Sequence, residues 1–224
     1  MDRRLFIGGG AVAVGLGAAW VVQNGRGAGQ PSELLVGMAN AQEASADTSM
    51  ITDMVLGDEN AAVEVIEYAS YTCPHCASFH AGAFKQLKSD YIDTGKIKFV
   101  YREVYFDRFG LWASMIARCG GDTNRFFGIS DMIYEKQREW TASGDPAQIV
   151  EELKKIGKIA GLDDATLDAC MQDADMAQSL VTWFQENQER DGINSTPSFV
   201  IDGTKYSNMS YADFSALLDD KIAG

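Results

Sequence analysis

The segment Cys73-Pro74-His75-Cys76 constrains the fold of this 224-residue chain more than any other feature. The apolar run before it, residues 61–69, is typical of a buried strand, and the apolar residues after it recur at helical spacing to about residue 91. A Cys-X-X-Cys pair between a strand and a helix is typical of a redox site. Cys73 would then begin a helix, where unpaired backbone N–H groups and the helix dipole stabilise a thiolate. The segment therefore predicts a thiol-disulfide oxidoreductase.

The composition narrows the classes of partner and cofactor. A formal net charge of −13 argues against nucleic acid as a partner, because phosphate backbones require a basic face. A zinc site built from Cys73, Cys76 and His80 would lack the second pair of ligands that zinc modules carry. We therefore expect no metal and no cofactor apart from a redox-active Cys73–Cys76 disulfide. We interpret His80, one helical turn beyond Cys76, as a histidine on the helix surface or at the edge of the core.

Residues 1–22 have the pattern of an export segment. Arg3 and Arg4 form a basic start, and residues 5–22 are an apolar run rich in Gly and Ala. A cleaved signal peptide and a membrane anchor both remain open, because the run is about as long as a membrane span but is diluted by glycine. Twin-arginine export is also open, although we favour the general secretion route. The pattern of residues 1–22 therefore predicts a protein that is exported to the periplasm. Residues 23–49 have the composition of a flexible linker.

The rest of the chain predicts an α/β fold whose sheet is interrupted by helices. Residues 50–108 open with a β-α-β pattern, which favours a parallel strand pair and a right-handed crossover. Residues 191–224 return to a β-β-α pattern, in which an Asp-Gly turn at 202–203 closes the first strand. The predicted elements are strands at 54–56, 63–68, 97–104, 196–203 and near 205–206, a helix from the cysteine pair to about Ile92, and a last helix at 211–222.

Residues 109–190 predict a helical subdomain, since apolar residues recur there at helical spacing without a strand pattern. Asp122 and Asp145 are in position to cap two of these helices. Cys119 and Cys170 each fall on an apolar helical face, and we predict a structural disulfide between them, with two buried free cysteines as the alternative. Closing a loop of about 50 residues would stabilise the fold by about 4 kcal/mol in the chain-entropy model, and by less if the bridge is strained.

Residues 50–224 resemble the DsbA-like family of thioredoxin-fold oxidoreductases. The resemblance rests on the Cys73-Pro74-His75-Cys76 segment, the stretch 195–203 (STPSFVIDG) and about 120 residues of helix-rich chain between them. It implies an α/β thioredoxin-like fold with an all-helical subdomain inserted into it. Ala62 stands where the family frequently has a proline, a departure that concerns a turn and not the chemistry.

We assign the redox chemistry to the cysteine pair. Cys73 is the predicted nucleophile and the exposed member, and Cys76 is the predicted resolving thiol on the inward side of the helix. His75 adds a hydrogen-bond donor or a positive charge near the sulfur. A stabilised reduced form makes a disulfide a strong oxidant, and the resemblance implies this direction here. Pro74 is tolerated at the first helical position, because its missing N–H would be unpaired there.

The resemblance implies roles for three more residues. The Thr196–Pro197 bond is expected to be cis, and both residues would line a groove in which an extended substrate segment pairs with the backbone. Glu67 matches the buried acid that lies beneath the active disulfide in the family, where it would exchange the proton of Cys76. The residue pattern alone leaves Glu67 open between this buried position and a solvent-facing position on an edge strand.

These features predict an exported monomer that oxidises reduced, unfolded exported proteins through a mixed disulfide. The resemblance implies re-oxidation by a DsbB-like, quinone-linked membrane protein. The alternatives are a disulfide isomerase or reductase of the same fold, or a non-catalytic exported binding module in which the Cys73–Cys76 pair is structural.

Overall fold

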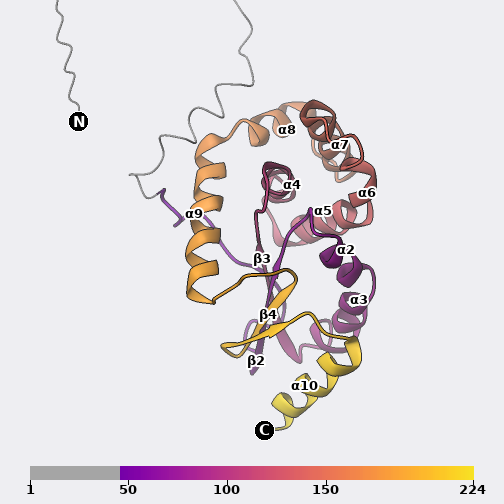
Figure 1. Cartoon of the computed structure of the whole chain (residues 1–224), viewed down its shortest axis with the longest axis vertical. Coiled ribbons are helices and arrows are strands. Elements are labelled where there is room, and N and C mark those ends of the chain that lie inside the picture. Colours follow the sequence, from indigo (N-terminus) through magenta and orange to yellow (C-terminus); the bar gives the residue numbers. More distant parts are fainter. Residues whose placement is uncertain (1–45) are drawn as a thin grey trace, which may run out of the picture. The chain divides into compact units, whose positions relative to one another are not determined.

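A five-stranded mixed sheet in the order β1-β3-β2-β4-β5 forms the centre of residues 46–224, the part of the chain that the computed structural model describes (Figure 1). The predicted export segment 1–22 and the predicted linker up to residue 45 lie outside the described residues. The strands are β1 (Met54–Gly57), β2 (Val63–Ala69), β3 (Ile97–Glu103), β4 (Ser198–Ile201) and β5 (Thr204–Ser207).

Strand β2 is the central strand, and the active-site segment follows its carboxyl end. It pairs parallel with β3, as the β-α-β pattern predicts, and antiparallel with β4. Both faces of β2 are covered, which explains its nearly continuous apolar sequence. Strands β4 and β5 form a hairpin whose turn is the predicted Asp-Gly pair. Asp202 and Gly203 have φ angles of 46° and 77°, the left-handed conformations that a two-residue hairpin turn requires.

The helix after Cys73 is shorter than the sequence predicts. Instead of one helix to about Ile92, the structure has α2 (Pro74–Ala81), α3 (Ala83–Leu87) and a π-helical turn, η1 (Lys88–Ile92). The break is at Gly82, whose φ and ψ of −125° and −90° are not helical. Glycine has a low helix propensity. Helix α3 packs against the last helix, Tyr211–Ala223, and this packing sets the direction of the chain after Gly82, which the apolar spacing does not predict.

Helices fill the chain between β3 and β4, and aspartates begin five of them. At each of these five starts an aspartate side chain accepts a hydrogen bond from a backbone N–H of the first turn, and the predicted caps Asp122 and Asp145 are among them. The short helix α6 was not predicted, because its single turn is too short to show a periodic pattern. The helices are α4 (Arg108–Arg118), α5 (Thr123–Glu135), α6 (Gln137–Trp140), α7 (Pro146–Ile159), α8 (Asp164–Met171) and α9 (Ala174–Arg190), and α10 (Tyr211–Ala223) ends the chain.

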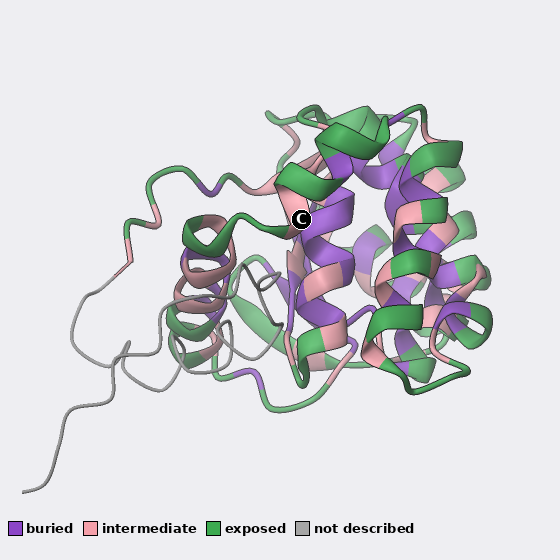
Figure 2. Cartoon of the chain, turned by 90° about the horizontal axis from the view of Figure 1, so that it is seen from above, coloured by how far each residue is buried: buried purple, intermediate pink, exposed green. Residues whose placement is uncertain are grey.

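The two faces of the sheet carry separate apolar clusters. Val63, Val65 and Ala69 of β2 belong to the larger cluster, which includes residues of α2, α5, α7 and α10. Ile66 and Tyr68 face the other way, into a smaller cluster that contains Phe184 of α9 and Val200 of β4. Figure 2 shows the consequence for the helices, whose inward faces are buried and whose outward faces are exposed.

The structure contains a disulfide between Cys119 and Cys170. It joins the C-terminus of α4 to α8, with a Cα–Cα distance of 5.8 Å. The bridge therefore lies wholly within the helical segment and connects two cysteines that are 51 positions apart in the sequence.

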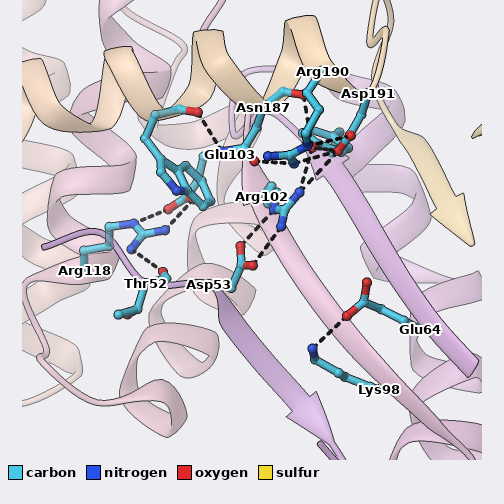
Figure 3. Close-up of polar contacts among 12 residues, drawn as sticks. Thr52, Asp53, Glu64, Lys98, Arg102, Glu103, Arg118, Asn187, Arg190 and Asp191 are labelled. Carbon is cyan, nitrogen blue, oxygen red and sulfur yellow. Dashed lines mark hydrogen bonds and ion pairs between the residues drawn. The ribbon is translucent and has the colours of Figure 1, made fainter. Parts of the chain in front are cut away.

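A partly buried polar network ties the start of the described chain to β3 and α9 (Figure 3). Arg102 of β3 forms two hydrogen bonds of 2.8 Å with Asp53 and pairs with Asp191 just after α9. Arg118 of α4 binds the Glu103 carboxylate through two nitrogens and also donates to the Thr52 carbonyl oxygen. Within residues 46–224, no helix has the length and apolar character needed to cross a membrane.

Candidate active site

Two free thiols lie at the start of α2, directly after the central strand. Cys73 is the N-cap residue of this helix, and Pro74 takes the first helical position, where its missing N–H has no cost. Cys73 is 9% exposed and Cys76 is fully buried. Cys73 is thus the more accessible thiol of the pair, as predicted, but it is more enclosed than the term "exposed member" implies.

Hydrogen bonds hold the pKa of Cys73 at about 5, well below that of an ordinary thiol. The largest cause is a hydrogen bond from the Cys76 thiol to the Cys73 thiolate. Burial opposes the shift, whereas the Thr196 side chain and the backbone N–H groups of Cys76 and His75 favour the thiolate. Cys73 is therefore a thiolate near neutral pH.

The pKa of Cys76 moves in the opposite direction. Burial raises it most, and the hydrogen bond to Cys73 and the negative charge of Glu67 raise it further. One thiol of the pair is therefore ionised and accessible, while the other is protonated and enclosed. This is the division of roles that a nucleophilic and a resolving thiol require.

The loop before β4 brings a cis proline against the nucleophile. The Thr196–Pro197 peptide bond is cis, and the Thr196 carbonyl oxygen lies 3.5 Å from the Cys73 sulfur, where it accepts a hydrogen bond when Cys73 is protonated. The Thr196 hydroxyl is buried and has no other partner among residues 46–224, which leaves it available to the thiolate. Residues separated by more than 120 positions thus meet at one sulfur atom.

The His75 ring makes no such contact. His75 is exposed on the outer side of α2, and no hydrogen bond from its ring is found within the described part of the chain. What His75 supplies to the Cys73 thiolate in this structure is its backbone N–H. A direct role of the ring stays a prediction.

Glu67 is fully buried in the central strand, the first of the two positions that its sequence pattern left open. Its Oε2 lies 3.0 Å from the Nε2 of His80, which is 5% exposed. The interpretation of His80 as a surface or core-edge histidine missed this contact. The available signal was its position four residues after Cys76, which places both side chains on the same face of a helix.

A second contact that the sequence did not reveal comes from the helical segment. The Gln137 side chain, at the start of α6, donates hydrogen bonds of 2.8 and 2.9 Å to the carbonyl oxygens of Tyr71 and Cys73. Asp107, the cap of α4, accepts a hydrogen bond from the Thr72 hydroxyl at 2.9 Å. The inserted helices therefore hold the backbone and side chains on both sides of the nucleophile.

No group of three or more His, Cys, Asp or Glu side chains within residues 46–224 is arranged to hold a metal ion.

The Cys73 pKa gives a measurable pH dependence. We expect the alkylation rate of Cys73 in the reduced protein to rise with pH around a midpoint of about pH 5, because only the thiolate reacts. A stopped-flow alkylation series with the Cys76→Ser variant as a comparison would measure it. A midpoint close to 9.0, the ordinary thiol value, would contradict the assigned hydrogen bonds.

The same shift predicts how stability depends on pH. The folded-state pKa of Cys73 is depressed, so the thiolate stabilises the reduced protein fully above the ordinary thiol pKa of 9.0, and this stabilisation is lost as the pH falls through about 5. The oxidised protein has no titrating thiol at Cys73. As the pH falls from 9.0 to about 5, the free energy of unfolding of the reduced form should therefore decrease relative to that of the oxidised form.

Comparisons with known proteins identify the family and the fold of the chain. A family model described as Thioredoxin matches residues 49–220. A putative protein-disulfide oxidoreductase of Rickettsia bellii is 35% identical over 170 residues, which cover 76% of this chain and 64% of the relative. The chain thus spans just under two thirds of that relative's length. A protein of the same description from Rickettsia typhi is 32% identical over 196 residues, with 85% of this chain and 72% of the relative covered.

A solved structure gives the same result at the level of the fold. The crystal structure of Wolbachia pipientis alpha-DsbA1 superposes with a TM-score of 0.71 at 26% identity, covering 77% of this chain and 92% of that one. The predicted fold class, a thioredoxin-like α/β fold with inserted helices, is confirmed. The chain therefore belongs to the DsbA-like protein-disulfide oxidoreductases of the thioredoxin family.

Proposed function

We propose that this protein is an exported thiol:disulfide oxidase that introduces disulfide bonds into reduced substrate proteins. The observation that supports it best is the opposite displacement of the two thiol pKa values around the start of α2. Hydrogen bonds that stabilise the Cys73 thiolate stabilise the reduced enzyme, and a stabilised reduced form makes the Cys73–Cys76 disulfide oxidising.

The oxidation proceeds in two exchange steps. A substrate thiolate attacks the Cys73 sulfur, a bond forms between them, and the Cys73–Cys76 bond breaks with its electrons on the Cys76 sulfur, which takes up a proton. A second substrate thiolate then attacks the substrate sulfur of this mixed disulfide and expels Cys73 as a thiolate. The substrate loses two electrons and two protons. The enzyme gains two electrons and keeps one proton on Cys76, and the other proton goes to solvent.

We place the substrate site beside the cis proline. Thr196 and Pro197 lie next to the Cys73 sulfur, so an extended segment bound there by its backbone would present a thiol to the nucleophile. Backbone recognition of this kind does not depend on the substrate's side chains, which suits an enzyme that acts on many unfolded proteins.

The proposed setting follows from the export segment and the family. Residues 1–22, with Arg3 and Arg4 before an apolar run, direct the chain to the periplasm in this proposal. The Cys119–Cys170 disulfide supports an oxidising compartment. We further propose that the protein acts as a monomer on reduced, unfolded exported proteins, and that a DsbB-like, quinone-linked membrane protein re-oxidises it.

Two measurements test the function. Equilibration of the Cys73–Cys76 pair with glutathione gives its reduction potential, and incubation with a reduced, unfolded protein measures the formation of disulfides. We expect a couple more oxidising than glutathione and stoichiometric oxidation of the substrate. A more reducing couple with reshuffling of scrambled disulfides would favour an isomerase or reductase, and the absence of any exchange would favour a non-catalytic module.

A further inference from the structure

The pair formed by Glu67 and His80 is the feature of the site that the mechanism above does not use. Glu67 comes from the central strand β2, and His80 comes from the last turn of α2. Both side chains are at least nine-tenths buried, and their nearest atoms, Oε2 and Nε2, are 3.0 Å apart. A buried carboxyl needs such a partner, because burial without one carries a large desolvation cost.

The His80 ring is held in one orientation. It stacks on the Tyr134 ring of α5 with a centroid distance of 4.2 Å and an interplanar angle of 16°. The Phe84 ring lies 4.5 Å from it and the Phe79 ring 5.7 Å, on α3 and α2 respectively. With its plane fixed by these aromatic neighbours, the ring directs Nε2 at Glu67 and fixes which carboxyl oxygen is occupied.

Each partner of the pair retains one buried polar atom without a hydrogen bond. Within residues 46–224, neither the Oε1 atom of Glu67 nor the Nδ1 atom of His80 has a partner. Buried polar groups in native folds nearly always have a hydrogen-bond partner, and a catalytic role is one explanation for a group that lacks one. Glu67 therefore keeps one oxygen with which it can exchange a proton.

The group that needs this proton is Cys76. The Cys76 thiol is fully buried one helical turn before His80, on the same face of α2, and Glu67 acts on it through its charge. In the exchange reaction, Cys76 leaves as a thiolate and must gain a proton, and in re-oxidation it must lose that proton again. Since Cys76 itself does not contact solvent, its proton has to pass through a neighbouring side chain.

We propose that His80 is the positioning residue of this proton exchange: it holds the Glu67 carboxyl toward Cys76 and shares the proton that Glu67 gives to and takes from the sulfur. The inference rests on the proposed function and deepens it. When the Cys73–Cys76 bond breaks, the electron pair stays on the Cys76 sulfur, the proton moves from Glu67 to that sulfur, and His80 stabilises the carboxylate that remains. In the reverse step, Cys76 loses its proton to Glu67 and attacks the Cys73 sulfur of a mixed disulfide, whose other sulfur leaves as a thiolate.

Other ionisable groups surround the His80 ring. The titratable or charged groups that face it from the elements packed around it are Glu67 on β2, Cys76 on α2, Tyr101 on β3, and Tyr134 and Asp131 on α5, with Lys85 of α3 acting on Asp131.

The test separates the two thiols by their order of reaction. When the reduced protein reacts with Ellman's reagent, Cys73 attacks first and releases one aryl thiolate, and Cys76 then attacks the Cys73 mixed disulfide and releases the second. In His80→Gln, the second phase should slow about 10-fold and lose its rise with pH, whereas the first phase should stay within about 2-fold. Lys85→Gln, which removes a cation from the exposed side of α3, is the matched control and should change neither phase.

A double-mutant cycle distinguishes positioning from a merely structural role. Glu67→Gln should slow the second phase by about 100-fold, and Glu67→Gln/His80→Gln should be no slower than Glu67→Gln alone, because His80 acts through Glu67. The double variant also removes the buried charge. If His80→Gln alone does not fold, the comparison of the double variant with Glu67→Gln therefore gives the result. Three results would overturn the inference: an unchanged rate of the second phase in His80→Gln, rate losses of the two single variants that multiply in the double variant, or an equal loss of rate in both phases. If the unmodified protein showed no first phase, the proposed function itself would fail.

Discussion

Replacing Cys73 with serine is expected to abolish disulfide exchange, whereas replacing Cys76 with serine is expected to leave a reactive thiolate that cannot complete the reaction. Only Cys73 combines a pKa of about 5 with access to solvent, so no other thiol of the site can attack a substrate. Serine at position 76 keeps an O–H donor in place of the thiol that lowers the Cys73 pKa most. Cys73 should therefore stay nucleophilic in this variant.

Intact-mass measurement after reaction with oxidised glutathione checks both outcomes. Cys76→Ser should gain one glutathione, bound to Cys73, while the unmodified protein should form its own disulfide and keep none. Cys73→Ser should gain nothing. Cys76→Ala is the matched control for the hydrogen bond, because it removes the donor and should raise the pKa of Cys73 above about 5. Modification of Cys73→Ser to the same extent as Cys76→Ser would contradict the assignment of the nucleophile.

The strands and the active-site helix start could be predicted because local pattern and packing agree there. The apolar run of β2 is continuous since the strand is covered on both faces, and the Asp-Gly turn at 202–203 has the backbone that its residues favour. The break at Gly82 and the short helix α6 could not be predicted. The break depends on the packing of α3 against α10, and α6 is a single turn, so local spacing encodes neither of them.

The residues of the candidate site also divide into those that the sequence indicated and those that it did not. Cys73, Cys76 and the Thr196–Pro197 pair carry motifs whose chemistry is specific, so the sequence could assign them to one site, and the structure brings Cys73 and Thr196 together. Their catalytic roles stay predictions. For Glu67 the residue pattern left a buried and a solvent-facing position open, because the choice depends on the helices that cover the strand. His80 and Gln137 were not found, because isolated polar residues on helices are usually at the surface, and their partners come from other elements.

Replacing Glu103 with glutamine is expected to lower the free energy of unfolding by about 3–5 kcal/mol, because it leaves a buried cation without its counter-ion. Glu103 is 1% exposed at the end of β3, and Arg118 binds its two carboxylate oxygens at 2.6 and 2.7 Å. Ser114 adds a third hydrogen bond at 2.8 Å. Arg118 is 7% exposed and also holds the Thr52 carbonyl oxygen, so the unpaired charge cannot reach solvent without disturbing the start of the fold (Figure 3).

The pair between Lys98 and Glu64 in the same view provides the matched control. Its nitrogen and oxygen are 2.7 Å apart, close to the spacing of the buried pair, but the side chains are 29% and 41% exposed. Glu64→Gln should therefore cost no more than about 1 kcal/mol in the same denaturant unfolding experiment. If the buried charge is the cause, the double variant Glu103→Leu/Arg118→Met should recover most of the loss, since it removes the cation together with its partner. Equal losses in Glu103→Gln and Glu64→Gln, or no recovery in the double variant, would show that burial does not set the strength of the Glu103–Arg118 pair.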